Sequence, residues 1–199
     1  MSVSPNVTYS SPAVAKTSAV DDVCCPFDPA TYTDEEGRPY KLISWDEKPF
    51  VKDGTYCCYY IPLAFGRGMT RALKKIDDYG AQVPKDEFMV LSDCHSPWYS
   101  NIFVTVAKNA DVEGAQIEKI SGTFLAKAFE GEYSNMGNWA REMQVLVKEM
   151  TEDKSTGDTK KVVETVDAKD MKIYFYYPTC PKCAQKHGKN HVVLYAKIS

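Results

Sequence analysis

The sequence lacks the features that would assign it to several large classes of proteins. No apolar run approaches the roughly 20 residues that a membrane-spanning helix needs. The net charge is −3, without the concentrated basic face that nucleic-acid binding requires. Residues 1–20 have no long apolar core, so no signal peptide is predicted, and seven is an odd number of cysteines, which fits reduced thiols. We therefore expect an intracellular, cytoplasmic protein, with organelle import as the alternative, that uses neither a membrane nor a nucleic acid.

The composition is that of one globular domain. Of the 199 residues, 44% are hydrophobic, which is enough apolar material for a core. Residues 1–22 are rich in Ser, Ala, Val, Thr and Pro and are predicted to be a disordered tail, and residues 23–199 to form the domain. Near its start, residues 41–45 and 50–52 read as short edge strands interrupted by Pro49.

The clearest elements are predicted within residues 122–150. Residues 123–129 are aromatic and small apolar residues with weak alternation, as in a strand, and Gly131 gives the backbone freedom for a sharp turn. A helix follows, with Ser134 or Asn135 as its cap. Its apolar residues recur at steps of three and four and form one stripe facing a sheet: Met136, Trp139, Ala140, Met143, Leu146, Val147 and Met150.

An earlier stretch follows the same order. Residues 55–61 are β-prone, and residues 65–80 have apolar positions at helical spacing. A hairpin is predicted after each helix, so the order strand, helix, strand, strand occurs twice. The first repeat spans about residues 50–108 and the second about 118–199, with a charged insertion at 151–170. This order predicts an α+β fold of tandem repeats, with an antiparallel sheet, two main helices and a cleft between the repeats.

Three runs of sequence resemble a known family. CCPFDP near the start, SGTFLAKAFEG in the middle and YPTCPKCAQKHGKN near the end resemble a stand-alone branch of the GyrI-like small-molecule-binding proteins, over about residues 24–198. The resemblance implies a cleft that binds flat, apolar, often cationic molecules on aromatic walls beside a buried carboxylate. It also implies, for some relatives, hydrolysis of strained cyclopropane-bearing toxins by acidic side chains that activate water. The chain departs from the family at Lys172, where a glutamate usually starts the penultimate strand.

Glu130 is the predicted catalytic residue. It ends a strand among Phe129, Tyr133 and Trp139, where partial desolvation would raise the pKa of its carboxyl and suit it to act as a general base or to meet a cation. The alternative is a solvated turn residue that stabilises the start of the next helix.

Aromatic residues are the predicted ligand walls. Tyr174 and Tyr176 lie on one face of their strand, opposite Ile173 and Phe175. A buried hydroxyl without a partner is costly, so tyrosines this dense imply water or a ligand beside them, although aromatic stripes are more often core. The ligand-binding candidates are Tyr56, Tyr59, Tyr60, Trp98, Trp139, Tyr174 and Tyr176.

The cysteines allow a structural zinc site. Cys180 and Cys183 form a C-P-K-C knuckle that matches tetrahedral zinc, and Cys24 and Cys25 would complete four ligands if the N-terminal segment docks on this loop. A reversible dithiol or plain loop cysteines are the alternatives. Cys57 and Cys58 are interpreted as small core residues within a strand.

Three functions agree with these sequence features. The first is a GyrI-like protein that hydrolyses a hydrophobic, aromatic or electrophilic compound in the cleft. The second is a non-catalytic protein that sequesters a planar ligand. The third is a zinc- or thiol-dependent interaction module. A monomer or a homodimer is expected in each case.

Overall fold

The computed structural model describes residues 27–58, 61–94, 96–152, 171–188 and 190–199. The predictions for the N-terminal tail, for Cys24 and Cys25, for Tyr59 and Tyr60 and for most of the charged insertion concern residues outside this part. None of the helices in the described part is long and apolar enough to cross a membrane.

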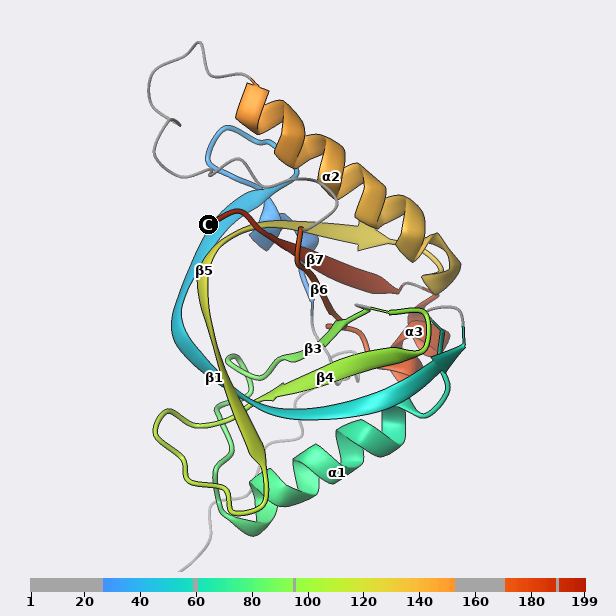
Figure 1. Cartoon of the computed structure of the whole chain (residues 1–199). Coiled ribbons are helices and arrows are strands. Elements are labelled where there is room, and N and C mark those ends of the chain that lie inside the picture. Colours follow the sequence, from blue (N-terminus) through green and yellow to red (C-terminus); the bar gives the residue numbers. More distant parts are fainter. Residues whose placement is uncertain (1–26, 59–60, 95, 153–170, 189) are drawn as a thin grey trace, which may run out of the picture.

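The described strands form one antiparallel sheet that closes on itself (Figure 1). The strand order is β2-β1-β4-β3-β6-β7-β5, and β5 also pairs with β1, so every strand except the short β2 belongs to a barrel. The elements are η1 (Pro29–Tyr32), β1 (Lys41–Cys58), β2 (Ile61–Pro62), α1 (Phe65–Asp78), β3 (Val90–Asp93), β4 (Tyr99–Thr105), β5 (Gln116–Glu130), η2 (Tyr133–Asn135), α2 (Met136–Glu152), β6 (Ile173–Tyr176), α3 (Pro181–His187) and β7 (His191–Lys197).

The α+β class and the order of the elements agree with the prediction. A strand, a helix and two strands follow one another from β1 to β4 and again from β5 to β7, with β2 and α3 added. That the two halves are structural repeats stays a prediction.

Strand β1 corrects the prediction of two short edge strands. It is a single strand of 18 residues that runs through Pro49 and pairs with β5 on one side and β4 on the other. A register shift between Trp45 and Lys48 forms a bulge, and Glu47 adopts a positive φ of 45° there. A bulge beside a proline accommodates the missing N–H and bends the strand, which helps the sheet to close.

The two long helices cover the outside of the barrel (Figure 1). Helix α1 packs Ala72 and Ile76 against the outer side of β1, β3 and β4. Helix α2 packs Trp139, Met143 and Val147 against the outer side of β5, β6 and β7, as its apolar stripe predicted.

The inside of the barrel is an aromatic core rather than the expected open cleft between two modules. Tyr174 and Tyr176 face this core and Phe175 faces α2, which confirms the predicted alternation of β6. The segment before β1 also packs against the core, and the Tyr32 hydroxyl lies 2.8 Å from that of Tyr195. The buried interior side chains are Phe50, Met89, Leu91, Phe103, Ile120, Phe124, Ala126, Tyr174, Val193 and Tyr195.

Candidate functional site

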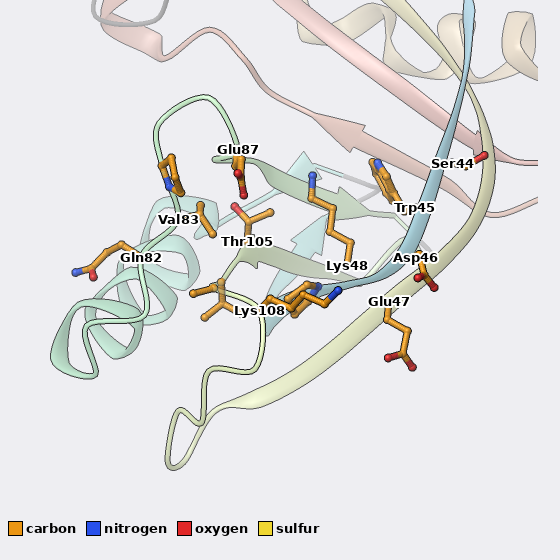
Figure 2. A pocket seen from close by; sticks show the side chains of 14 residues that line it. Ser44, Trp45, Asp46, Glu47, Lys48, Gln82, Val83, Glu87, Thr105 and Lys108 are labelled. Atoms are coloured by element: carbon orange, nitrogen blue, oxygen red, sulfur yellow. The ribbon is translucent and has the colours of Figure 1, made fainter.

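A pocket of about 380 Å³ opens where the β1 bulge faces the loop before β3 (Figure 2). We call it the bulge pocket. Its volume falls within the range of about 300–1,000 Å³ that is usual for small-molecule sites. It is lined by residues 44–49 of β1, residues 82–84 and 87 of the loop, and residues 105–108 at the end of β4.

The bulge decides which side chains enter this pocket. Trp45 and Lys48 point into the space between β1 and the loop, whereas Asp46 and Glu47 project on the other side of the strand (Figure 2). The Glu47 N–H donates a hydrogen bond to the Ser121 hydroxyl (2.8 Å). The two residues of the bulge thus turn outward, and Trp45 and Lys48 on either side of it share the inward face.

Backbone hydrogen bonds hold the loop against the barrel. The Val106 N–H donates to the Pro49 carbonyl (3.2 Å), and the Ala107 N–H donates to the Ala81 carbonyl (2.9 Å). The end of β4 is therefore bonded to β1 on one side and to the start of the loop on the other. These contacts fix the three walls of the bulge pocket relative to one another.

Trp45 connects the bulge pocket to the aromatic core. The centroid of its ring lies 4.5 Å from that of Phe124, 4.9 Å from that of Tyr195 and 6.1 Å from that of Phe50. Because this indole is held on several sides, it presents a rigid apolar wall to the pocket.

Lys48 is the half-buried cation of the bulge pocket. Its ammonium lies 5.4 Å from the centre of the Trp45 ring and 3.1 Å from the Met89 sulfur. Burial lowers the pKa of Lys48 below its usual value of 10.5, and the charge of Glu87 partly opposes that effect. Among the described residues, no carboxylate forms an ion pair with Lys48.

A second group of charges lies along the inward face of neighbouring strands. The Lys52 ammonium pairs with Glu118 (2.7 Å), and the Lys172 ammonium lies 3.9 Å from the same carboxylate. Lys172 also lies 4.9 Å from the centre of the Tyr174 ring. Burial raises the pKa of the Tyr174 hydroxyl, and a hydrogen bond with Lys172 acts against that rise. Lys172, the position at which the chain departs from the family, therefore still lies beside a carboxylate, which comes from β5.

Asp93 is a buried carboxylate that the sequence reasoning missed. It is 5% exposed, and both its oxygens accept hydrogen bonds from the Asn101 side chain (2.8 and 3.1 Å). The strand pattern of β3 could have identified this acid. Leu91 and Asp93 are two residues apart and so lie on the same face of the strand, and Leu91 faces the core. Trp45, Lys48 and Glu87 were missed as well, since the bulge was not predicted.

Glu130 lies at another place on the barrel. It is the last residue of β5, its side chain is 53% exposed, and its Oε2 lies 3.3 Å from Nε2 of His191 on β7. The His191 side chain is only 10% exposed, and the ring of Phe27 packs beside it at 5.0 Å. Gly122, the partner of Trp45, is eight residues before Glu130, or about 26 Å along the strand. The structure therefore does not bring Glu130 to the bulge pocket.

The other predicted site residues are dispersed. Tyr56 and Trp98 are exposed, whereas Tyr174 and Tyr176 face the barrel core. Trp139 is buried outside the barrel and stacks on Phe129 with centroids 5.4 Å apart.

The predicted cysteine site is described in part. Cys180 caps α3, and its sulfur accepts a hydrogen bond from the Cys183 N–H (3.4 Å). Cys183 is buried, as is Cys57, whereas Cys58 is exposed, because successive residues of β1 face opposite sides, so the prediction of a core position was wrong for Cys58. Within the described ranges, no group of three or more His, Cys, Asp or Glu side chains is arranged to hold a metal ion.

Fold and pocket together define an α+β barrel protein with a pocket of small-molecule size. The family model described as Bacterial hydrolase matches residues 15–198, and the chain belongs to this family. A comparison with curated proteins gives no match.

Two solved structures match most of the chain. A crystal structure of an uncharacterized conserved protein from Listeria innocua superposes with a TM-score of 0.53 and 12% sequence identity, over 81% of this chain and 93% of that one. The structure of SAV2435 bound to tetraphenylphosphonium has a TM-score of 0.46 and 11% identity, over 80% of this chain and 93% of that one. At this level of identity the Listeria structure supports the fold alone.

Proposed function

We propose that this chain is a GyrI-like protein that binds a small, hydrophobic, aromatic compound in the bulge pocket. The observation that carries the proposal is the position of Trp45, whose ring forms one wall of a pocket of about 380 Å³ while Phe124 and Tyr195 pack around it. A flat ring that stacks on a fixed indole loses little entropy and gains about 0.5–1.5 kcal/mol beyond the burial of its area.

Titration of a fluorescent naphthalene derivative tests this function. We expect saturable binding that Trp45→Ala weakens about tenfold, which corresponds to about 1.4 kcal/mol. The matched control is Trp98→Ala, because Trp98 is exposed and does not line the bulge pocket. Equal affinities of the wild type and Trp45→Ala would refute binding at this place.

A second candidate function, hydrolysis of an electrophilic compound, is favoured by the Glu130–His191 pair. A carboxylate oxygen 3.3 Å from an imidazole nitrogen stabilises the protonated form of that ring. The other ring nitrogen of His191 then takes a proton from a water molecule that attacks the substrate. The description of the family as hydrolases agrees with this chemistry.

Turnover of a panel of aryl esters and aryl epoxides tests the hydrolysis. Glu130→Gln is expected to lower kcat by about 10²-fold or more, while the binding of the same compounds is retained. Glu132→Gln is the control, because Glu132 is an exposed glutamate two residues away. If the compounds bind and none is turned over by the wild type, the chain is a binder without this activity.

A further inference from the structure

We propose that the bulge pocket selects aromatic ligands that carry a carboxylate, and that Lys48 is the residue that binds this group. The inference rests on the proposed binding function of the same pocket. It names the chemical class of the ligand, and it differs from the cationic ligands that the family resemblance implies.

The surroundings of the Lys48 ammonium favour an anionic ligand. Its contacts are the Trp45 ring and the Met89 sulfur, and no described carboxylate forms an ion pair with it. A half-buried ammonium that has given up part of its water gains from a charge-assisted hydrogen bond. A ligand carboxylate at this position would provide that bond.

The other charged residues that line the bulge pocket lie on its other walls or on the outer side of the bulge. Glu47 lies on the outer side of the bulge, where its carboxylate pairs with Lys119 (3.0 Å), and Asp46 projects on the same side (Figure 2). Glu87 lies on the wall opposite Lys48, and Lys108 closes the β4 side. The lining charges that remain are therefore those of Lys48, Glu87 and Lys108, and Lys48 is the one that lies 5.4 Å from the centre of the Trp45 ring.

The distance between Trp45 and Lys48 suits an aromatic ring that carries a carboxylate. The ammonium lies 5.4 Å from the ring centroid, on the same inward face of β1. An aromatic ring stacked on the indole would place a substituent on its edge near the ammonium. A carboxylate attached directly to one or two fused rings fits this distance.

Calorimetric titration with three matched ligands tests the inference: 2-naphthoate, the neutral 2-naphthamide and the cationic 2-naphthylmethylamine. We expect the wild type to bind 2-naphthoate about tenfold more tightly than the amide. Lys48→Met is expected to remove this preference without changing the affinity for the amide by more than about threefold. Lys48→Arg keeps the charge and is expected to keep the preference, and Glu87→Gln is expected to strengthen the binding of 2-naphthoate.

The three ligands separate the possible failures. If the wild type binds all three equally, or prefers the cation, the choice of a carboxylate is wrong while the binding function stands. A preference for 2-naphthoate that survives in Lys48→Met shows that Lys48 is not the anchor and also overturns the inference. If none of the three binds to the wild type, the proposed binding function fails with it.

Discussion

At the scale of single residues, the environment of a side chain depends on pairings that lie far away in the sequence. Lys48 belongs to a run of charged residues that reads as a solvated edge, yet the bulge turns it inward beside Trp45. Tyr174 and Tyr176 were predictable, because strict alternation in a strand needs no knowledge of its partners.

We expect the half-buried charge of Lys48 to lower the stability of the fold. Because burial lowers the pKa of the folded state below the ordinary value of 10.5, the unfolded chain binds more protons between these two pKa values. The destabilising contribution of Lys48 is therefore fully present at neutral pH, and it disappears as the pH rises to about 10.5.

We predict that the gain in stability of Lys48→Met over the wild type is largest near neutral pH and shrinks towards pH 10.5. Urea unfolding of both proteins over this pH range measures the difference between their free energies of unfolding. The effects of ionisable groups that both proteins share cancel in this difference. A difference that stays constant or grows with pH would show that the pKa of Lys48 is not lowered by folding.

At the scale of elements, the helices were predictable and the longest strand was not. Local periodicity predicts α1 and α2, whereas β1 depends on its pairing with β5, which lies on average more than 70 residues later. The sequence signal at Pro49 argues for a break, and the bulge before it lets the strand continue. The bulge pocket was missed for the same reason, since it exists only where this bulge meets the loop before β3.

Gly122 is the residue of β5 opposite Trp45, and its backbone requires glycine. Its φ is +130°, and a Cβ would lie 2.3 Å from the backbone oxygen of Ser199. We predict that Gly122→Ala lowers the free energy of unfolding by about 1–3 kcal/mol, measured by denaturant titration. Gly66→Ala is the control, because Gly66 has no atom within 4 Å of a built Cβ, and no loss is expected there. Equal effects would contradict the strain at Gly122.

Met143 tests the layer between α2 and the barrel. It is 0% exposed, so Met143→Ala is expected to cost about 2–5 kcal/mol in the free energy of unfolding. Val145 lies on the same helix and is 53% exposed, so Val145→Ala is expected to change stability by less than about 0.5 kcal/mol. Comparable losses in the two variants would mean that α2 does not pack on β5 and β7 through this stripe.

At the scale of the whole molecule, closure of the barrel decides what the interior contains. The order of elements in each half was predictable, but β3 meets β6 through only two residue pairs, Leu91 with Tyr176 and Ser92 with Phe175. No local sequence pattern predicts such pairs between distant segments. An open cleft was therefore expected where the structure has a packed core. The pocket-forming bulge and the buried Asp93 both depend on this closure.

The N-terminal segment is joined to the barrel beside the strand that follows the cysteine knuckle. Phe27 packs on His191 at the start of β7, and the knuckle lies in the preceding segment, at the start of α3. Cys24 and Cys25 precede Phe27 by three and two residues and lie outside the described part. Phe27, the first described residue, thus lies next to the start of β7, and this supports the prediction that the two cysteine pairs share one site.

We predict one zinc ion per chain, held by Cys24, Cys25, Cys180 and Cys183. Four thiolates form a closed tetrahedral site, so the metal would stabilise the fold and would have no open position for catalysis. Native mass spectrometry of the full chain is expected to show stoichiometric zinc, and Cys180→Ser is expected to lose the metal and lower the unfolding midpoint. Cys58→Ser is the control, because Cys58 is an exposed thiol on β1. A metal-free wild-type chain whose stability does not respond to a chelator would leave these cysteines as a dithiol or as ordinary loop residues.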